Sequence, residues 1–458
     1  MQYTFFLHYF NTLFNNASVS LIHYTFHPIT NIITFSIILV ILVINFRFNQ
    51  EEMQSIKLIY KTGSGPSSSH TMGPHKAAEI FKNIYTTANK FKVTLYGSLA
   101  LTGKGHLTDV AIIKALFPQK CEIIWEKDTA LPYHSNAMKL EAINENDNLI
   151  GSEIAYSVGG GDIVWEKDIN SPKKTDEAIY PLSKLSTIQN WTYDTGKTYW
   201  EYVEETEDND LWDYLNEVWK AMRTAVENGI EAEGVIPGVL ALSRKAYSFI
   251  MKSRGYDSNL QNKALVLAYA LAVSEENACG GTIVTAPTCG SCGVVPGVLY
   301  HLQKRQNFSD KRILRALATA GLIGNIVKTN ASISGAEAGC QAEIGTACSM
   351  AAAAATQLFG GSTSQIEYSA EMAMEHHLGM TCDPIAGLVQ IPCIERNSFA
   401  ASRALTCNVY AMLSDGRHRI SFDTVVATMM EVGKNLPNIY KETAQGGLAT
   451  QYYNEIVL

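Results

Sequence analysis

The sequence predicts an α+β region followed by an all-helical region, as in a two-domain protein. Strand-like and helix-like patterns alternate between residues 55 and 166, whereas nearly every pattern from Trp200 onward has helical spacing. The 458 residues are enough for two or three domains, and a hydrophobic content of 47% supports a large core. We therefore expect an α+β domain with a linker at 53–198 and an all-helical domain at 199–458.

The charge pattern argues against nucleic acid and anionic membrane surfaces as partners. The net charge is −8, and the acidic residues are dispersed apart from a denser run near Glu204–Asp210. Nine cysteines, an odd number that lies mostly in the second half, do not have the pattern of a disulfide framework. A metal site in a reducing compartment, the cytoplasm, explains them better.

The first 52 residues differ from the rest of the chain. Residues 29–46 are almost wholly apolar and long enough for a transmembrane helix. Residues 1–46 contain no Lys, Arg, Asp, Glu or Gly, a bias more typical of translated AT-rich noncoding DNA than of a signal peptide. We expect a misassigned start, with Met53 as the natural one. The alternative is a membrane anchor, with the rest of the chain on the cytoplasmic side.

The first region contains strands and helices joined by glycine-rich loops. A Gly/Ser loop runs into the first helix, and amides and hydroxyls at a helix N-terminus form either an anion site or an ordinary capped start. Gly159–Gly161 either let the backbone approach a ligand or simply turn. The patterns predict strands at 55–60, 92–100 and 121–126, a hairpin-like pair over 139–166, and helices after 63–74 and over 106–117.

The second region begins after a polar stretch, 170–198, which is the best linker candidate. Helical spacing then predicts helices that include 211–229, 234–251 and 262–277, the last of them apolar nearly all round and therefore buried. The alanine run Ala351–Ala355 predicts another buried helix.

Three cysteines stand next to turn or helix-end signals: Cys340, Cys382 and Cys393. Gly379 ends the helix before the second of them, and Pro392 stiffens the entry to a helix whose N-terminus would stabilise a thiolate of the third. Each is, on its own, equally well explained as a small buried hydrophobe. Three thiolates leave one coordination position open, which suits a catalytic 4Fe–4S cluster, although spacing alone does not select the metal.

The stretch Gly335–Asn397 resembles the bacterial iron–sulfur L-serine dehydratases, also called L-serine ammonia-lyases. The resemblance extends from about Met53 onward. It implies an α+β domain before an all-helical one, a homodimer, conversion of L-serine to pyruvate and ammonia, and a 4Fe–4S cluster held by Cys340, Cys382 and Cys393. Other strings of this family follow in order: GSGPSSSHTMGP (63–74), GSLALTGKGH (97–106), SVGGGD (157–162), EENACGGTIVTAPT (275–288) and KETAQGGLA (441–449).

The resemblance also implies catalytic and substrate-binding residues. His70 and His134 match family histidines, and we prefer His134 as the base for the α-proton because Asn136, two residues on, points the same way in extended backbone. His70 would hold the carboxylate or help protonate the leaving hydroxide. Asp162 stands where the family leads us to expect a large apolar residue. The expected substrate contacts are Ser67, Ser68, Ser69, Thr71, Asn136, Ser157, Gly159, Gly160, Thr288 and Gly290.

Other features leave alternatives open. Cys289 and Cys292 form a CxxC that we assign to packing near the site rather than to the cluster, and we expect no ligand role for Cys348 or Cys407. No lysine and glycine-loop combination indicates pyridoxal phosphate. The alternatives to an L-serine ammonia-lyase are a related iron–sulfur lyase for L-cysteine or L-threonine and a membrane-tethered amino-acid sensor.

Overall fold

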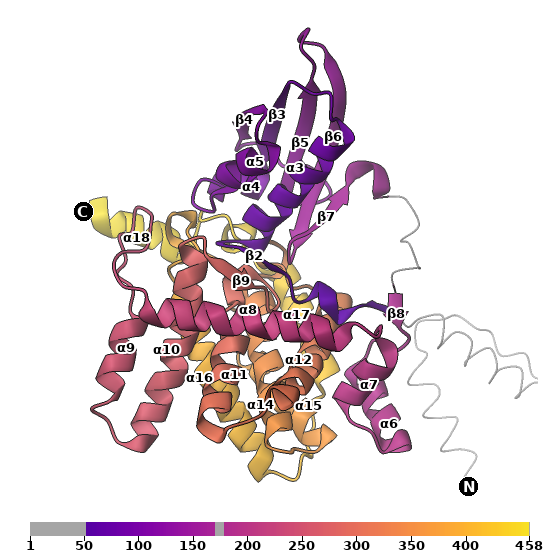
Figure 1. Cartoon of the computed structure of the whole chain (residues 1–458), viewed down its shortest axis with the longest axis vertical. Coiled ribbons are helices and arrows are strands. Elements are labelled where there is room, and N and C mark those ends of the chain that lie inside the picture. The colour runs from indigo at the N-terminus through magenta and orange to yellow at the C-terminus, as the bar shows by residue number, and fades with distance from the viewer. Residues whose placement is uncertain (1–51, 170–177, 458) are drawn as a thin grey trace, which may run out of the picture. The chain divides into compact units, whose positions relative to one another are not determined.

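The computed structural model describes residues 52–169 and 178–457, so the apolar run at 29–46 lies outside the described residues. Within these ranges an α/β region precedes a helix-rich region, which confirms the predicted fold class (Figure 1). None of the helices in the described ranges combines the length and the apolar character that a membrane crossing needs.

A five-stranded sheet forms the centre of the α/β region, with strand order β4-β3-β5-β6-β7. β3 pairs in parallel with β4, and all other neighbours are antiparallel. The strands span Lys90–Tyr96 (β3), Lys120–Glu126 (β4), Asn136–Ile143 (β5), Leu149–Gly159 (β6) and Asp162–Trp165 (β7).

Three helices pack on this sheet: α3 (Gly73–Ile84), α4 (Gly97–Thr102) and α5 (Thr108–Leu116). Phe81 and Ile112, from α3 and α5, are fully buried against Leu95 and Leu140 of the strands. The second predicted strand, 92–100, is too long at its end, because Gly97 adopts φ +54 and starts α4 there.

The prediction of a strand at 55–60 is wrong. Ile56–Leu58 form a 3₁₀-helix, η1, which begins because the Ser55 hydroxyl accepts a hydrogen bond of 3.1 Å from the Lys57 amide. The apolar side chains do not alternate between two faces, since Ile56, Ile59 and Tyr60 are all fully buried in the core of the helical region. The described chain thus starts inside the helical core before it enters the sheet.

Two short antiparallel pairs connect distant segments. β1 (Met53–Gln54) pairs with β8 (Ala178–Tyr180), and β2 (Thr62–Ser64) pairs with β9 (Thr282–Val284). Figure 1 shows β2 and β9 side by side between the sheet and the helices. The β2–β9 pair therefore joins the segment that leads into the sheet to the helical region.

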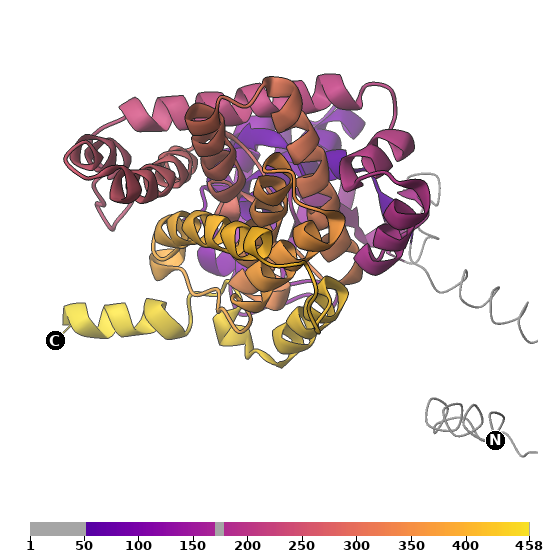
Figure 2. The same cartoon turned by 90° about the horizontal axis from the view of Figure 1, so that it is seen from below.

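The helical region, seen from below in Figure 2, contains both helices that were predicted to be buried, α10 and α14. The buried residues of α10 begin at Val266, and its first turn is exposed. Ala351–Ala355 of α14 are fully buried. The helices are α6 (Leu185–Thr195), α7 (Tyr199–Thr206), α8 (Leu211–Glu231), α9 (Ala246–Ser253), α10 (Ser258–Ala278), α11 (Val294–Gln306), α12 (Asp310–Asn330), α13 (Gly335–Ala338), α14 (Thr346–Leu358), α15 (Thr363–Glu375), α16 (Cys393–Leu413), α17 (Phe422–Asn435) and α18 (Gly447–Val457).

Two predictions in this region are wrong in part. The expected linker 170–198 contains the helix α6, so it is not a linker over its whole length. The expected helix 234–251 begins only at Ala246, because Gly234 and Gly238 adopt φ +100 and +129 on either side of Pro237.

Asp162, at the start of β7, forms ion pairs with two lysines of neighbouring segments. Its carboxylate contacts Lys61 and lies 2.8 Å from the Lys328 Nζ atom. These lysines lower the pKa of Asp162, although its burial acts in the opposite direction. The charged side chain at this position is thus stabilised by the helical region.

Candidate active site

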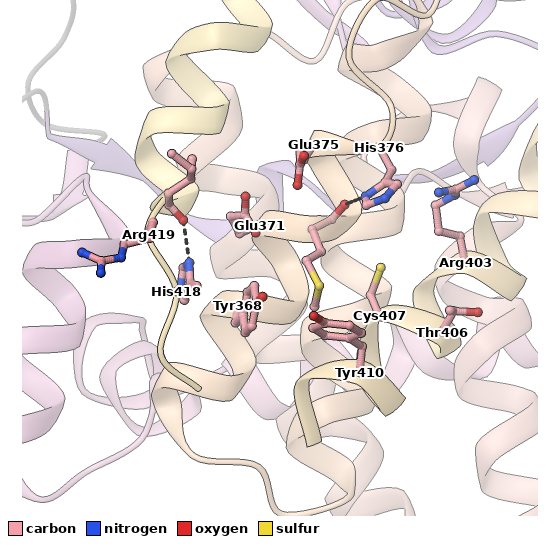
Figure 3. A pocket seen from close by; sticks show the side chains of 12 residues that line it. Tyr368, Glu371, Glu375, His376, Arg403, Thr406, Cys407, Tyr410, His418 and Arg419 are labelled. Carbon is pink, nitrogen blue, oxygen red and sulfur yellow. Dashed lines mark hydrogen bonds between the residues drawn. The ribbon is translucent and has the colours of Figure 1, made fainter. Parts of the chain in front are cut away.

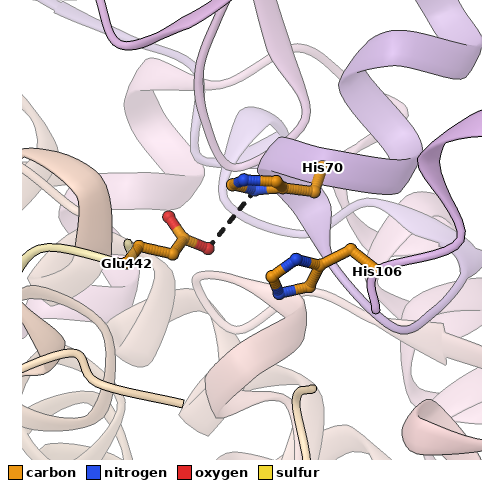
Figure 4. Close-up of side chains that lie close together, drawn as sticks. All are labelled: His70, His106 and Glu442. Carbon is orange, nitrogen blue, oxygen red and sulfur yellow. Dashed lines mark ion pairs between the residues drawn. The ribbon is translucent and has the colours of Figure 1, made fainter. Parts of the chain in front are cut away.

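Loops of the α/β region meet the segment before α18 at one buried place. His70 is fully buried, Glu442 is 7% exposed, and the His70 Nδ1 atom lies 3.4 Å from Glu442 Oε1. The His106 ring lies beside the His70 ring, with centroids 4.3 Å apart and planes tilted by 35°. In Figure 4 the two histidines approach from one side and Glu442 from the other.

The serine-rich loop folds as a π-helix, Ser68–Met72, that fixes the two histidines. Ser67 Oγ accepts from the His70 amide at 3.1 Å, and Thr71 Oγ1 donates to the His106 carbonyl at 2.7 Å. The hydroxyls of Ser67 and Thr71, which were predicted to bind substrate, therefore form hydrogen bonds to the backbone of His70 and His106. Ser68 and Ser69 are also buried, and Ser69 Oγ lies 2.9 Å from His70 Nδ1.

The hydrogen bonds of His70 define which nitrogen is free to accept a proton. Ser98 Oγ donates to the Glu442 carbonyl at 2.8 Å, so it accepts from His70 Nε2 at 3.1 Å. The Nδ1 atom is then the acceptor, and it faces Ser69 and Glu442. Burial, and after it the neighbouring His106, lowers the pKa of His70 well below its usual range. Burial raises the pKa of Glu442 to about 8, so its carboxyl carries a proton at neutral pH.

His106 has the opposite tautomer. Its Nδ1 atom lies 3.1 Å from the Thr102 carbonyl and donates to it, which leaves a lone pair on Nε2. Among the described residues Nε2 has no hydrogen-bond partner, and the residue is 1% exposed. Burial lowers the pKa of His106 to about 4.

His134 lies near His70, and its charge contributes to the lowered pKa of that histidine. The His134 Nδ1 atom accepts a hydrogen bond of 3.0 Å from the Asn136 amide. A neutral His134 ring therefore carries its proton on Nε2 and presents a donor. Burial also lowers the pKa of His134.

Asn136, Ser157 and Ser334 are among the buried polar side chains that lack partners within the described part of the chain. Asn136 is fully buried with both amide atoms unpaired, and the hydroxyls of Ser157 and Ser334 are also unpaired. Buried polar groups are normally hydrogen-bonded, so unpaired ones indicate a place for a ligand or water. Gly159 lies against this group, since a Cβ there would come within 3.1 Å of the Ser334 Cβ, and Gly160 next to it adopts φ +58.

Thr288 and Gly290 lie beside a carboxyl that the sequence did not single out, Glu343. Thr288 Oγ1 donates to Glu343 Oε1 at 2.7 Å, and a Cβ on Gly290 would lie 2.9 Å from the same oxygen. Glu343 Oε2 is 4.0 Å from the Cys382 Sγ atom. Burial raises the pKa of Glu343 well above its usual range.

The three predicted cysteines are buried or nearly so and lie close together. A hydrogen bond from Cys382 lowers the pKa of Cys340 to about 6, and the neighbouring Arg396 also lowers it. Burial, followed by the charge of Cys340, raises the pKa of Cys393 well above its usual range. Cys393 begins α16, as predicted.

The segment before α18 pairs directly with the backbone of Cys382. The Cys382 amide donates to the Tyr440 carbonyl at 2.8 Å, and the Glu442 amide donates to the Cys382 carbonyl at 2.7 Å. Glu442 adopts φ +59 there. This segment therefore connects the histidine cluster to the cysteine cluster.

The remaining cysteines pack elsewhere. Cys289 is 1% exposed and lies 3.4 Å from the Met72 sulfur, and burial raises the pKa of both Cys289 and Cys292. Cys348 donates to the Ala400 carbonyl at 3.3 Å inside the helical core. Cys407 lies farther along α16.

Sequence reasoning missed Glu343, Glu442, His106 and Arg396. Each is a single polar residue inside a string that resembles the family, so only that context could have indicated it. Glu442 is 373 residues from its partner Ser69, a distance over which no local pattern predicts contact.

Comparison with known proteins defines the class to which this fold and site correspond. The family described as serine dehydratase alpha chain matches residues 80–449, and the chain belongs to this family. It is 38% identical over 443 residues to the L-serine dehydratase of Streptomyces coelicolor, covering 85% of this chain and 97% of that protein. It is 39% identical over 449 residues to L-serine dehydratase 2 of Escherichia coli, covering 87% and 98%. The L-serine dehydratase of Helicobacter pylori is 38% identical over 447 residues, which cover 86% and 98%.

Proposed function

We propose that this chain is an L-serine ammonia-lyase that converts L-serine to pyruvate and ammonia. The observation that carries the proposal is the meeting of a buried histidine cluster with three neighbouring cysteine thiols, joined by the Tyr440–Glu442 backbone. The named activity of relatives that align over nearly their whole length supports the same reaction.

The three cysteines fit a 4Fe–4S cluster as proposed ligands. Within the described ranges, the group of three possible ligands that comes within 4.8 Å is His70, His106 and Glu442, so the three sulfurs are spaced more widely than a single ion requires. Arg396 beside Cys340 offsets part of the negative charge that three thiolates would bring. When bound, such a cluster would supply an open iron that acts as a Lewis acid on the substrate hydroxyl.

The unpaired groups of Asn136, Ser157 and Ser334 are the proposed contacts for the polar groups of the substrate. Each is buried, so each gains a hydrogen bond when an ammonium or carboxylate enters. Ser68 and Ser69 of the π-helix lie close to the same histidines and are proposed to complete the site. Thr288 and Gly290 are proposed to form the border of the substrate site next to the cysteines, where Thr288 is hydrogen-bonded to Glu343.

For the α-proton we propose His70 in place of His134 as the base. His134 accepts the Asn136 amide on Nδ1 and so offers a donor, suited to holding a substrate oxygen. His70 offers a lone pair on Nδ1 once Ser69 turns its hydroxyl toward Glu442 Oε1, at 3.4 Å. A proton taken up on Nδ1 faces Glu442 Oε1, and a protonated carboxyl can still accept a hydrogen bond from it.

The test is direct. The full chain, purified without oxygen, should release pyruvate and ammonia from L-serine in equal amounts, and L-cysteine and L-threonine should react more slowly. If ammonia is released faster from L-cysteine or L-threonine than from L-serine, that amino acid is the substrate and the proposal is wrong. Binding of L-serine without any product would favour the sensor alternative. We also propose a cytoplasmic location and a homodimer. Sedimentation of the same sample tests whether the chain is a dimer.

A further inference from the structure

A pocket lies in the helical region, between α15 and α16. Its volume is about 410 Å³, within the range typical of small-molecule sites. Figure 3 shows Tyr368, Glu371 and Glu375 from α15, Arg403 and Tyr410 from α16, and His418 from the segment that follows.

This pocket is separate from the proposed active site. Cys407, which lines it, and Cys393, which begins α16, are 14 positions apart on one helix, or about 21 Å. None of the residues placed in the proposed active site lines the pocket.

Glu371 is the feature that indicates a ligand. The residue is 3% exposed, and in the described part of the chain its carboxyl makes no hydrogen bond and no ion pair. The nearby His418 makes no hydrogen bond to Glu371, because its Nε2 atom contacts Glu367 and its Nδ1 atom contacts the Ile420 carbonyl. A buried carboxylate without a partner is costly, so an incoming cation would be favoured.

The other groups around Glu371 agree with this interpretation. Burial raises the pKa of Glu371 to about 7, and the neighbouring Glu375 and Glu367 raise it further, whereas His418 lowers it. The Tyr368 ring stacks on His418 with centroids 4.3 Å apart, which fixes an aromatic wall. Aromatic walls next to a carboxylate suit an ammonium group.

The rim carries the opposite charge. Arg403 and Arg419 are exposed, line the pocket and form no ion pair within the described ranges. In Figure 3 Glu371 and Arg403 lie on opposite sides of the pocket. A ligand that meets both groups would carry two charges of opposite sign at its two ends.

We propose that this pocket binds a small molecule with a primary ammonium group at one end and a carboxylate at the other, with the ammonium at Glu371 and the carboxylate at Arg403. An amino acid whose amino group is several carbons from its carboxylate has this chemistry. The volume leaves room for the connecting chain.

The experiment is titration calorimetry of the full chain with 5-aminopentanoate, pentylamine and pentanoate. We expect 5-aminopentanoate to bind most tightly, pentylamine more weakly, and pentanoate least. Glu371→Gln should weaken binding of 5-aminopentanoate by roughly thirtyfold, because the lost partner is a buried charge. Arg403→Gln should reduce 5-aminopentanoate to the level of pentylamine. Glu431→Gln, at an exposed position of α17, is the matched control and should change nothing.

Glu371→Gln should fold, since it removes an unpaired buried charge, and its melting temperature reports this separately. Equal binding of 5-aminopentanoate to the Glu371→Gln and unaltered proteins would overturn the proposal. So would absence of binding at millimolar concentrations. A dimer that Glu371→Gln dissociates would also overturn it, because a second copy of the chain would then fill the pocket.

Discussion

The α/β region and the helical region contribute different side chains to the proposed active site. Loops at the end of the sheet carry His70, His106 and His134, whereas the helical region carries the three thiols and Glu442. The hydrophobic core of the sheet is a separate and smaller cluster, and the helical core also encloses Met53–Tyr60. The histidines and the thiols therefore lie on two separately packed cores, and neither region alone contains the whole proposed site.

The strongest test of this division removes the sulfur half. Replacing Cys340, Cys382 or Cys393 with alanine should abolish bound iron and pyruvate release, because each thiolate is a proposed ligand. Iron content and visible absorbance of anaerobically purified protein measure the first effect. Cys348→Ala and Cys407→Ala, matched changes in the same helical region, should retain both. Full iron content in any of the first three variants contradicts the assignment.

Removing the proton half should leave the iron in place. His70→Ala should lower kcat by roughly 10²–10⁴ with normal iron content, because the base is lost but the thiols remain. Exchange of the substrate α-hydrogen with solvent should stop as well. His134→Ala is the comparison variant and should raise KM more than it lowers kcat. The reverse pattern between the two variants would return the base to His134.

The two regions should both lose stability in acid. Burial lowers the pKa of His106, in the α/β region, and of His301, in the helical region, from 6.5 to about 4. The unfolded chain binds more protons in this window, so stability is full above pH 6.5 and is lost as the pH falls toward 4. Protonation of His106 accounts for up to about 3 kcal/mol of this loss in the free energy of unfolding. The free energy of unfolding, measured with denaturant between pH 4 and 7, should change less steeply with pH in His106→Gln and His301→Gln than in the unaltered protein.

The smallest effect should come from the ion pairs between the regions. Asp162→Ala leaves Lys61 and Lys328 close together without their carboxylate and should cost about 1–2 kcal/mol of unfolding free energy. Asp162→Asn keeps the side-chain volume and should cost nearly as much, because the effect is one of charge. No change in either variant would show that these ion pairs do not stabilise the junction.

Helix-rich segments of the sequence were the easiest to predict. The alanines of α14 and the apolar positions of α10 from Val266 onward are buried in the helical core, as their pattern predicts. Residues 55–60 were misread because strand-like alternation and a capped turn place apolar residues at similar spacing. Pro237 between two glycines outweighed the helical pattern at 234–245.

The site was predictable only in parts. The cysteines and the serine loop follow local signals and a family resemblance, and the structure places them near one another. Glu442 could not be predicted, because its role depends on a backbone pairing with Cys382 that brings two distant segments together. The tautomers of His106 and His134 likewise depend on single carbonyl and amide contacts that no pattern encodes.

The path of the chain through the β2–β9 pair has a mechanical consequence. The chain leaves the helical core after Tyr60 and passes to the sheet through β2, which is hydrogen-bonded to β9. The Gly65 amide also donates to the Gly281 carbonyl, and the Thr285 amide donates to the Lys61 carbonyl, at the two ends of this pair. A force that pulls the serine-rich loop away from the segment before Thr288 must therefore break several backbone hydrogen bonds together, so these two segments move as one piece.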